Sequence, residues 1–195
     1  MDTADIGPVL PPGEALWSHR FETALGSCGL VWSARGIVAS LLPPVSAARL
    51  AQLRPTARPV EVPPPHMARV VDGIRALLAG EGGDLPDLRD VALDERGIPE
   101  FRRQVHALTR TIPLGQTRTY GEIAAALGQP GAARAVGRAE GDNPFAPIVP
   151  CHRVMGAGGA PTGFSAPGGV ETKRRLLLAE ARAAGQMAGD QQALF

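Results

Sequence analysis

A change in hydrophobic periodicity near residue 99 constrains the fold of this chain more than any other feature. Before it, residues 28–33 and 36–42 form two apolar runs separated by a Gly-containing turn, a pattern typical of neighbouring strands. After it, apolar residues such as those within 101–112 recur every three or four positions, which is typical of helices that pack by one face. A chain with strands first and helices later is predicted to have an α+β fold.

The same patterns divide the chain into two predicted domains. Residues 67–78 have apolar residues at helical spacing, and the Pro-rich residues 55–65 are predicted to be a surface connector. Residues 80–93 are rich in Gly, Asp and Pro and end in a predicted short strand at 91–93. The sequence therefore predicts an N-terminal domain at 1–95, a C-terminal domain at 96–185 and a disordered tail at 186–195.

The composition is that of a globular protein, with 44% hydrophobic and 20% charged residues among 195. No apolar run approaches the roughly 18 residues that a membrane span needs. The N-terminal segment also lacks the basic and apolar stretches of a signal peptide. We therefore expect a cytoplasmic protein with no membrane partner.

Charge is distributed unevenly along the chain. Residues 1–100 contain nine Arg and thirteen acidic residues, whereas residues 101–185 contain eleven Arg or Lys and five acidic residues. Because Arg and Lys neutralise phosphates, a basic C-terminal half favours binding to a polyanion such as DNA. An uneven but solvated surface would give the same counts.

Cys28 and Cys151 are the two cysteines of the chain. A cytosolic compartment disfavours a disulfide between them, and neither has a second cysteine at metal-ligand spacing. We therefore predict two free thiols, no metal and no cofactor.

Residues 119–140 have the pattern of a helix-turn-helix. Thr119 and Glu122 have the spacing of a capping box, which predicts that a short helix begins there. A Gly-Gln-Pro turn follows at 128–130, and residues 131–140 are predicted to be a second helix. The side chains that this second helix would present are Ala132, Ala133, Arg134 and Arg138.

Cys151 is followed directly by His152, after Pro150 and an apolar segment that is predicted to be a strand. The thiolate is the nucleophilic form of cysteine, and a neighbouring imidazole helps to generate it near neutral pH. A single cysteine is more often a small buried apolar residue. The dipeptide alone leaves both interpretations open.

Several motifs in a fixed order extend this pattern. They are Thr-Tyr-Gly-Glu-Ile-Ala at 119–124, Gly-Ala-Ala-Arg-Ala-Val-Gly at 131–137, Asn143-Pro144, Pro-Cys-His-Arg-Val at 150–154, Gly-Phe-Ser at 163–165, Gly168-Gly169 and Lys173. The series resembles the O6-alkylguanine-DNA alkyltransferase family over residues 97–182, and more weakly over 20–96. The resemblance implies a ribonuclease-H-like N-terminal domain of a small sheet with helices, followed by a mainly helical, winged-helix-like domain that contains the helix-turn-helix.

The resemblance also implies an activity, which is DNA repair in a single turnover. Cys151 would accept the alkyl group from O6 of guanine, and activity on O4-alkylthymine is left open. His152 would act as a base on the thiol through a water, and Glu180 would orient His152. Tyr120 would donate its phenol proton to the departing guanine. The alternatives to these functional roles are that Glu180 is a solvated residue at the end of a helix and that Tyr120 is an ordinary core residue.

The implied partner is double-stranded DNA carrying O6-alkylguanine, bound by a monomer. Because the target atom lies inside the stacked duplex, the nucleotide would be extruded, and Arg134 would fill the gap that it leaves. A phosphate contact or a plain surface position is the alternative for Arg134. The helix-turn-helix would enter the minor groove through Thr119, Ala132, Ala133 and Arg138.

The remaining matched residues would shape the site. Asn143 and Pro150 would position the segment around Cys151, and Arg153 would be either structural or a phosphate partner. Phe164 and Ser165 would wall the alkyl pocket. Asp142 stands where family members often have a basic or neutral residue, which predicts modest affinity for DNA.

Three other functions compete with alkyl transfer. A non-catalytic protein that binds alkylation damage would not need Cys151. A cysteine hydrolase is disfavoured because adjacent residues on one strand point to opposite faces and because no oxyanion motif accompanies Cys151 and His152. A DNA-binding regulator would leave both residues unexplained.

Overall fold

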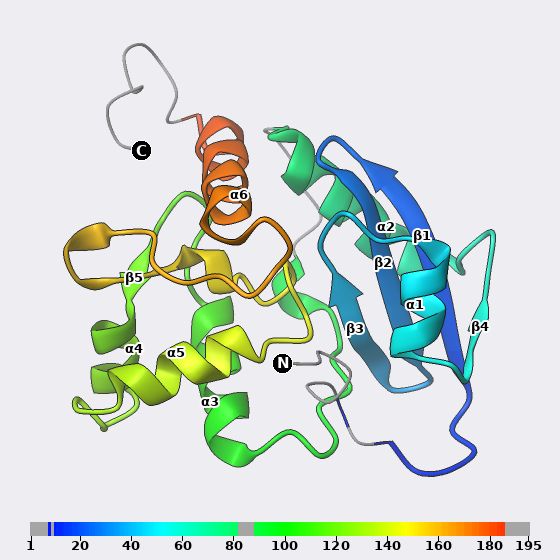
Figure 1. Ribbon diagram of the computed structural model, residues 1–195, viewed down its shortest axis with the longest axis horizontal. Helices are drawn as coiled ribbons and strands as arrows, with labels where there is room; N and C mark the ends of the chain where they lie inside the picture. Colours follow the sequence, from blue (N-terminus) through cyan, green and yellow to red (C-terminus); the bar gives the residue numbers. More distant parts are fainter. Residues whose placement is uncertain (1–7, 9, 82–87, 186–195) are drawn as a thin grey trace.

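The computed structural model describes residue 8, residues 10–81 and residues 88–185, and Figure 1 shows a sheet region beside a helical region. The sheet region contains β1 (Leu16–Thr23), β2 (Gly26–Ser33), β3 (Gly36–Leu41), α1 (Ala47–Leu53), β4 (Ala57–Pro59) and α2 (Pro65–Ala79). The later elements are η2 (Leu88–Asp90), α3 (Glu100–Arg110), β5 (Arg118–Thr119), α4 (Tyr120–Ala126), α5 (Ala133–Gly141), η3 (Cys151–Arg153), β6 (Val154–Met155), η4 (Ala157–Gly159) and α6 (Gly169–Ala183). The predicted α+β fold, with strands first and helices later, is confirmed.

The main sheet has the strand order β3-β2-β1-β4. The two strands predicted at 28–33 and 36–42 are present as the antiparallel pair β2 and β3. Residues 55–65 were predicted to be a connector only, but they include β4, which pairs in parallel with β1 from Leu16↔Ala57 onward. Pattern reasoning missed β4 because Pro59 lies in it, and proline is tolerated in a strand only at an edge such as this one.

Helices α1 and α2 cover opposite faces of this sheet (Figure 1). On one face, Leu50 of α1 packs with Val31 and Val38. The sequence did not predict α1, whose approach depends on Gly29: a Cβ there would lie 3.1 Å from Cδ1 of Leu50. The glycine therefore allows a helix to lie directly on the strand.

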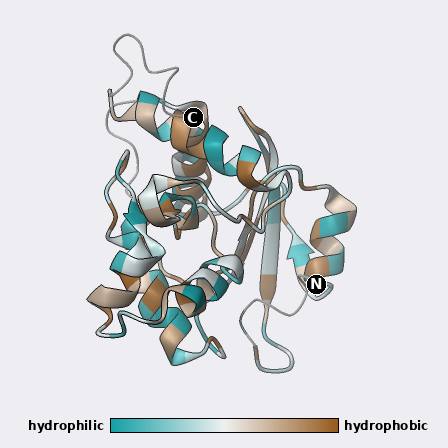
Figure 2. Ribbon diagram, turned by 60° about the vertical axis from the view of Figure 1, so that its left-hand side comes forward, coloured by the Kyte–Doolittle hydropathy of each residue, from teal (hydrophilic) through white to brown (hydrophobic). Residues whose placement is uncertain are grey.

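Helix α2 covers the other face of the sheet, as its apolar spacing predicted. Its buried residues lie on one side, including Val70, Ile74 and Leu78, and Figure 2 shows hydrophobic and hydrophilic residues alternating around the helices. Pro65 occupies its first turn, and Gly80 ends it in the left-handed conformation with φ of 71°.

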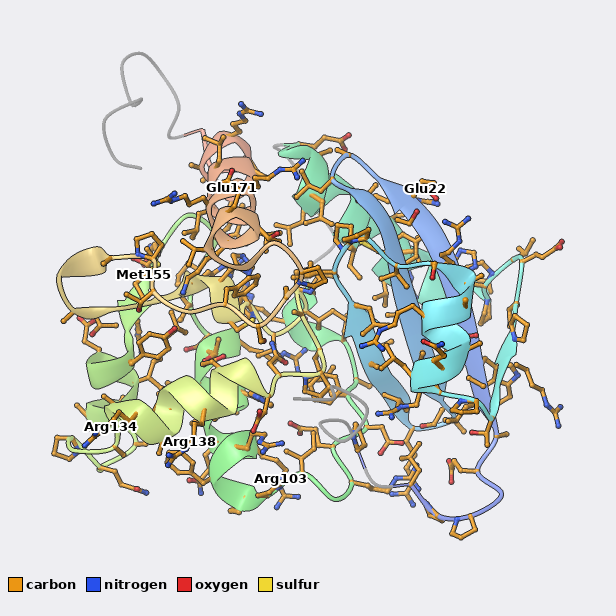
Figure 3. The ribbon with its side chains drawn as sticks, viewed as in Figure 1. Glu22, Arg103, Arg134, Arg138, Met155 and Glu171 are labelled. Carbon is orange, nitrogen blue, oxygen red and sulfur yellow. The ribbon has the colours of Figure 1, made fainter. Side chains whose placement is uncertain are left out.

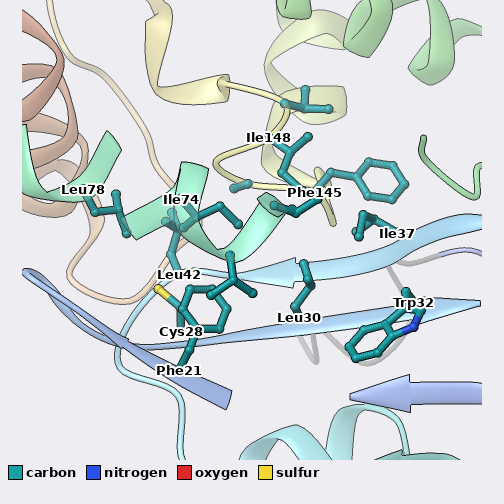
Figure 4. Packing of buried hydrophobic residues seen from close by; sticks show 14 of the residues in the cluster. Phe21, Cys28, Leu30, Trp32, Ile37, Leu42, Ile74, Leu78, Phe145 and Ile148 are labelled. Atoms are coloured by element: carbon teal, nitrogen blue, oxygen red, sulfur yellow. The ribbon is translucent and has the colours of Figure 1, made fainter. Parts of the chain in front are cut away.

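The core of the sheet region also contains residues from the second half of the chain. Figure 4 shows Phe145 and Ile148 packed with Ile37 of the sheet and Ile74 of α2. The Ser40 amide of β3 donates to the Pro144 carbonyl at 2.8 Å. The segment that leads to Cys151 is thus packed against the sheet by both apolar contacts and a backbone hydrogen bond.

Helices α3, α4 and α5 form the helical region around a small core that includes Val105, Ile123 and Val136. The capping box is confirmed, since the Thr119 and Glu122 side chains each accept a hydrogen bond from the other's backbone amide. The second helix begins later than predicted, at Ala133, and Ala132 is its N-cap.

No helix in the described part of the chain is long and apolar enough to cross a membrane. The predicted disordered tail at 186–195 lies outside the described residues.

Candidate functional site

Cys151 begins a 3-10 turn, η3, and not the strand that the sequence predicted. The Cys151 amide donates to the Val149 carbonyl at 2.9 Å, and the Arg153 amide donates to the Pro150 carbonyl at 2.9 Å. These short-range bonds close turns where a strand would leave its amides for a neighbour. The argument against a hydrolase that adjacent residues lie on opposite faces of a strand therefore does not apply.

His152 is fully buried, and its ring is held by Glu180 of α6. Its Nε2 lies 2.7 Å from Oε1 of Glu180. Arg153 shares the same carboxylate, with its Nε donating at 2.9 Å to Oε2 and its Nη2 at 2.7 Å to Oε1. His152, with Arg153 beside it, lowers the pKa of the Glu180 carboxyl to about 2, although burial alone would raise that pKa.

The ionised carboxylate fixes which nitrogen of His152 carries a proton. Glu180 accepts at Nε2, so this nitrogen bears the hydrogen and Nδ1 keeps a lone pair. In the part of the chain that is described, Nδ1 is buried and has no hydrogen-bond partner. An oriented imidazole with an unoccupied acceptor nitrogen is the arrangement that a base requires.

Asn143 connects the end of α5 to the turn at Cys151. Its amide nitrogen donates to the Val149 carbonyl at 2.8 Å, and its carbonyl oxygen accepts from the Phe145 amide at 2.9 Å. The side chain thus holds the loop between the second helix and Cys151 at both ends. Pro150 precedes the turn with φ of −82°.

The Cys151 thiol is nearly inaccessible, with 6% exposure. Burial raises its pKa to about 12, and the carboxyl of Glu140 adds to this effect. The Asn143 side chain and the Lys173 ammonium oppose it. The resting side chain is therefore a thiol, and a reaction at sulfur must remove the proton as the new bond forms.

A pocket of about 340 Å³, here called the helical pocket, opens beside Cys151 between α4, α5 and the loop before α6. Tyr120 lies in it, and its hydroxyl donates to the Thr162 carbonyl at 3.2 Å. Burial raises the pKa of the Tyr120 phenol, so this group keeps its proton at neutral pH. The lining residues are Tyr120, Gly137, Glu140, Gly141, Cys151, Thr162, Gly163, Phe164 and Ser165.

Glu140 is a member of this pocket that the sequence reasoning missed. It is 4% exposed, Thr109 donates to one oxygen, and the other oxygen has no hydrogen-bond partner among the residues that are described. Burial raises its pKa to about 7. Its place in an Ala- and Arg-rich helix resembled that of a surface residue, so no local signal marked it.

Lys173 lies behind the pocket and is the only lysine in the sequence. It is fully buried, and its Nζ donates to the Val154 carbonyl at 2.6 Å and lies 5.6 Å from the centre of the Tyr120 ring. Burial lowers the pKa of this ammonium. The site thus contains a cation, a carboxyl and a thiol that share one poorly solvated volume.

A second cavity of about 390 Å³, here called the sheet-side cavity, meets the helical pocket at Cys151. It lies between β3, α1 and the loop that carries Phe164 and Ser165. Four residues line both spaces: Gly141, Cys151, Phe164 and Ser165.

Four of the residues expected to touch DNA lie at the start of the two short helices, and Arg138 lies in the last turn of α5. Arg134 and Arg138 are exposed on α5 (Figure 3), while Ala132 and Ala133 are half-buried. Thr119 caps α4. Asp142 forms an ion pair with Arg102 at 2.7 Å, and Arg153 is buried against Glu180, which favours the structural role for Arg153 over a phosphate contact.

Both cysteines are free and buried. Cys28 packs with Phe21 and Ile74 in the sheet core, and burial raises its pKa to about 12. It lines neither of the two spaces. Within residues 8, 10–81 and 88–185, no group of three or more His, Cys, Asp and Glu side chains could hold a metal ion.

Comparison with known proteins gives consistent matches over this site. Residues 100–182 match the family model of the 6-O-methylguanine DNA methyltransferase DNA-binding domain. The chain is 50% identical over 119 residues to a methylated-DNA–protein-cysteine methyltransferase of Mycolicibacterium paratuberculosis, covering 61% of this chain and 68% of that protein. It is 54% identical over 84 residues to the protein of the same name from Shigella flexneri, covering 43% and 47% of the two chains.

Solved structures agree with these matches. Mycobacterium tuberculosis OGT in complex with DNA superposes with a TM-score of 0.68 at 37% identity, covering 85% of this chain and 94% of that one. The O6-methylguanine-DNA methyltransferase of Pyrococcus kodakaraensis has the same fold at 23% identity, with a TM-score of 0.61 over 85% of this chain and 98% of that one.

Proposed function

The chain belongs to the methylated-DNA–protein-cysteine methyltransferase family, and on this premise we propose that it repairs DNA by moving an alkyl group from O6 of guanine onto Cys151. The observation that carries the proposal is that Cys151 and Tyr120 line the same pocket, beside the paired helices α4 and α5. The acceptor is a residue of the chain itself, so the reaction uses no cofactor. The thioether product is not released, and each molecule acts once.

The proposed reaction begins with removal of the thiol proton. The unoccupied Nδ1 of His152 accepts it through a water, while Glu180 stabilises the imidazolium that forms. The sulfur then attacks the alkyl carbon as the bond from that carbon to O6 breaks. Proton removal must accompany the attack by sulfur, because a thiol with a pKa near 12 forms very little free thiolate at neutral pH.

Tyr120 completes the proton balance in this proposal. Guanine departs with the electron pair of the broken bond, and the Tyr120 phenol donates a proton to it. The imidazolium of His152 holds the proton that came from the thiol, and exchange with solvent returns both side chains to their resting forms. The raised pKa of Tyr120 means that the phenol carries its proton at neutral pH and has one to donate.

Access to O6 requires that the nucleotide leave the duplex, at a cost of a few kcal/mol. We propose that α5 enters the minor groove, with Ala132 and Ala133 against the backbone and Arg134 in the space that the base vacates. Arg138 and Thr119 lie on the same pair of helices and would contact the phosphates. The exposure of Arg134 and Arg138 supports these roles.

The finer features of the architecture are also part of this proposal. We assign residues 1–95 to a ribonuclease-H-like domain and residues 96–185 to a winged-helix-like domain. The antiparallel core of the sheet supports the first assignment, and the β5–β6 pair beside α4 supports the second. The protein would act as a cytoplasmic monomer.

The test is to incubate the protein with a duplex containing one O6-methylguanine and to measure the intact mass. The expected result is a gain of one methyl group per protein, located on the peptide that carries Cys151. Cys28 is the internal control because it is also a buried free thiol and lies outside the pocket. Cys151→Ser and an unmodified duplex should give no gain.

Two other outcomes would select another function. Unchanged mass with retained binding to the alkylated duplex would indicate a protein that only recognises the damage. Repeated turnover of an ester or amide would indicate a hydrolase.

A further inference from the structure

The Glu140 carboxyl lines the helical pocket with one of its oxygens unused. Thr109 of α3 donates to Oε1 of Glu140 at 2.5 Å, and Thr109 itself does not line the pocket. This bond therefore holds the carboxyl from its protein side. The other oxygen, Oε2, is buried and has no hydrogen-bond partner among the described residues. Because buried polar atoms are nearly always paired, the open oxygen indicates a partner that a bound molecule supplies.

The charges around Glu140 determine what this oxygen can offer to such a molecule. Burial raises the pKa of Glu140 to about 7 against the opposing effects of Thr109 and Lys173. The Glu140 charge in turn adds to the effect of burial in raising the pKa values of Tyr120 and Cys151. Near neutral pH the carboxyl therefore exists in two forms. The neutral acid donates a hydrogen bond through its hydroxyl, whereas the carboxylate only accepts.

An O6-alkylated guanine presents lone pairs on both sides of its reacting oxygen. During transfer the alkyl carbon lies at the Cys151 sulfur, so O6 is the part of the base that lies nearest to Glu140's side of the pocket. The ring nitrogens that flank O6 are N1 and N7. N7 is an acceptor in guanine, and N1 becomes one because alkylation of O6 removes its hydrogen. Only the neutral form of Glu140 complements either nitrogen, since a carboxylate would oppose its lone pair.

We infer that the neutral acid form of Glu140 donates a hydrogen bond from Oε2 to a ring nitrogen beside O6 of the extruded base, N1 or N7, and keeps it as guanine departs. The inference rests on the proposed alkyl transfer and adds a residue that acts on the leaving group. As the bond from carbon to O6 breaks, its electron pair spreads into the ring nitrogens, so this hydrogen bond strengthens in the transition state. The proton stays on Glu140, and Tyr120 remains the group that protonates guanine.

The experiment measures single-turnover methyl transfer at saturating duplex in Glu140→Gln and Glu140→Met. Gln donates through an amide that does not titrate, so the wild-type rate relative to Glu140→Gln should fall roughly tenfold between pH 6 and pH 8, as the wild-type carboxyl ionises. Met has no donor, and Glu140→Met should be roughly tenfold slower than the wild type at pH 6 with unchanged affinity for the duplex. Glu81→Gln is the matched control, because Glu81 is exposed and lies outside the pocket, and its pH profile should follow the wild type.

Substrate analogues separate this contact from an effect on the thiol. Removing the Glu140 charge also lowers the pKa of Cys151, and that change would alter transfer from any substrate. Duplexes containing O6-methyl-1-deazaguanine or O6-methyl-7-deazaguanine replace one ring nitrogen by a CH group. With the analogue that lacks the contacted nitrogen, Glu140→Met and the wild type should react at the same rate, and the wild-type fall with pH should disappear. The other analogue should retain both differences, which identifies the nitrogen.

Two results would overturn the inference. One is a slower Glu140→Met reaction with both analogues, which would show that Glu140 acts on the thiol or on the fold. The other is the same pH profile for the wild type and Glu140→Gln on O6-methylguanine. Should Glu140→Met fail to fold, the wild-type pH profiles decide alone, because a fall that persists with both analogues has the same meaning. Absence of methyl transfer in the wild type would instead reject the proposed function, so the two failures are distinguishable.

Discussion

Replacing Glu140 by Gln is expected to stabilise the protein at alkaline pH and to destabilise it slightly well below pH 4.5, where only the cost of the added amide donor remains. Burial raises the pKa of this carboxyl from its ordinary value of 4.5 to about 7 in the folded protein. Between pH 4.5 and about pH 7 the Glu140 carboxyl has lost its proton in the unfolded chain but still holds it in the folded chain. Folding stability therefore falls as the pH rises from about 4.5 to about 7 and is constant above that range.

The size of the effect follows from the two pKa values. The rise from 4.5 to about 7 corresponds to about 3 kcal/mol, since each pKa unit is worth about 1.4 kcal/mol. Gln has the same shape and retains the acceptor for the Thr109 hydroxyl, but its amide nitrogen takes the place of the oxygen that has no hydrogen-bond partner. Allowing about 1 kcal/mol for that donor, we expect a net gain of about 2 kcal/mol at pH 8.

The assay is urea unfolding at pH 5 and pH 8, followed by tryptophan fluorescence. Trp17 and Trp32, the two tryptophans, both belong to the sheet region. Glu81→Gln is the matched control, because Glu81 is exposed, and it should shift stability equally at both pH values. A Glu140→Gln protein that is no more stable than the wild type at pH 8 would refute the argument from burial.

Three further substitutions test other parts of the structure. Glu180→Gln should lower the free energy of unfolding by about 3 kcal/mol at neutral pH. The reason is that the folded pKa of about 2 gives stability that is present above pH 4.5 and is lost as the pH falls towards 2. A loss in urea unfolding that is as large at pH 2 as at pH 7 would contradict this expectation. Arg134→Ala should slow methyl transfer from duplex DNA by roughly tenfold or more but should slow transfer from a single strand with the same O6-methylguanine much less, and equal slowing of both would argue against a role in base extrusion. Gly36→Ala should destabilise the protein by about 2 kcal/mol or more, because φ is +144° and a Cβ would overlap the Ala92 carbonyl oxygen; an unchanged melting temperature would show that the backbone relaxes.

Features that depend on residues close in sequence could be predicted. The capping box of Thr119 and Glu122 involves residues three positions apart, and both of its hydrogen bonds are present. The apolar spacing of residues 67–78 likewise predicted the buried side of α2. Such patterns predict the structure without knowledge of distant contacts, because the helix repeat fixes which side chains share a face.

Features that depend on distant contacts could not be predicted. The apolar residues before Cys151 resembled a strand, but Phe145 and Ile148 are apolar because they enter the sheet core, and the backbone there forms turns. Glu140 and Lys173 are thirty-three positions apart, and only the packing of α5 and α6 around Cys151 brings their charges to the same thiol. No local sequence pattern indicates that two residues so far apart in the chain act on the same thiol.

The attachment of the Cys151 segment to the sheet core affects how mutational screens of this protein should be interpreted. Leu30 of β2 lines neither space at the sulfur, yet it belongs to the same cluster of buried residues as Phe145 and Cys151. A smaller residue at Leu30 would let the reactive turn shift and slow alkyl transfer without any contact to the substrate. Loss of activity therefore identifies a residue as part of the chemistry only when the folding stability of the variant is measured beside it.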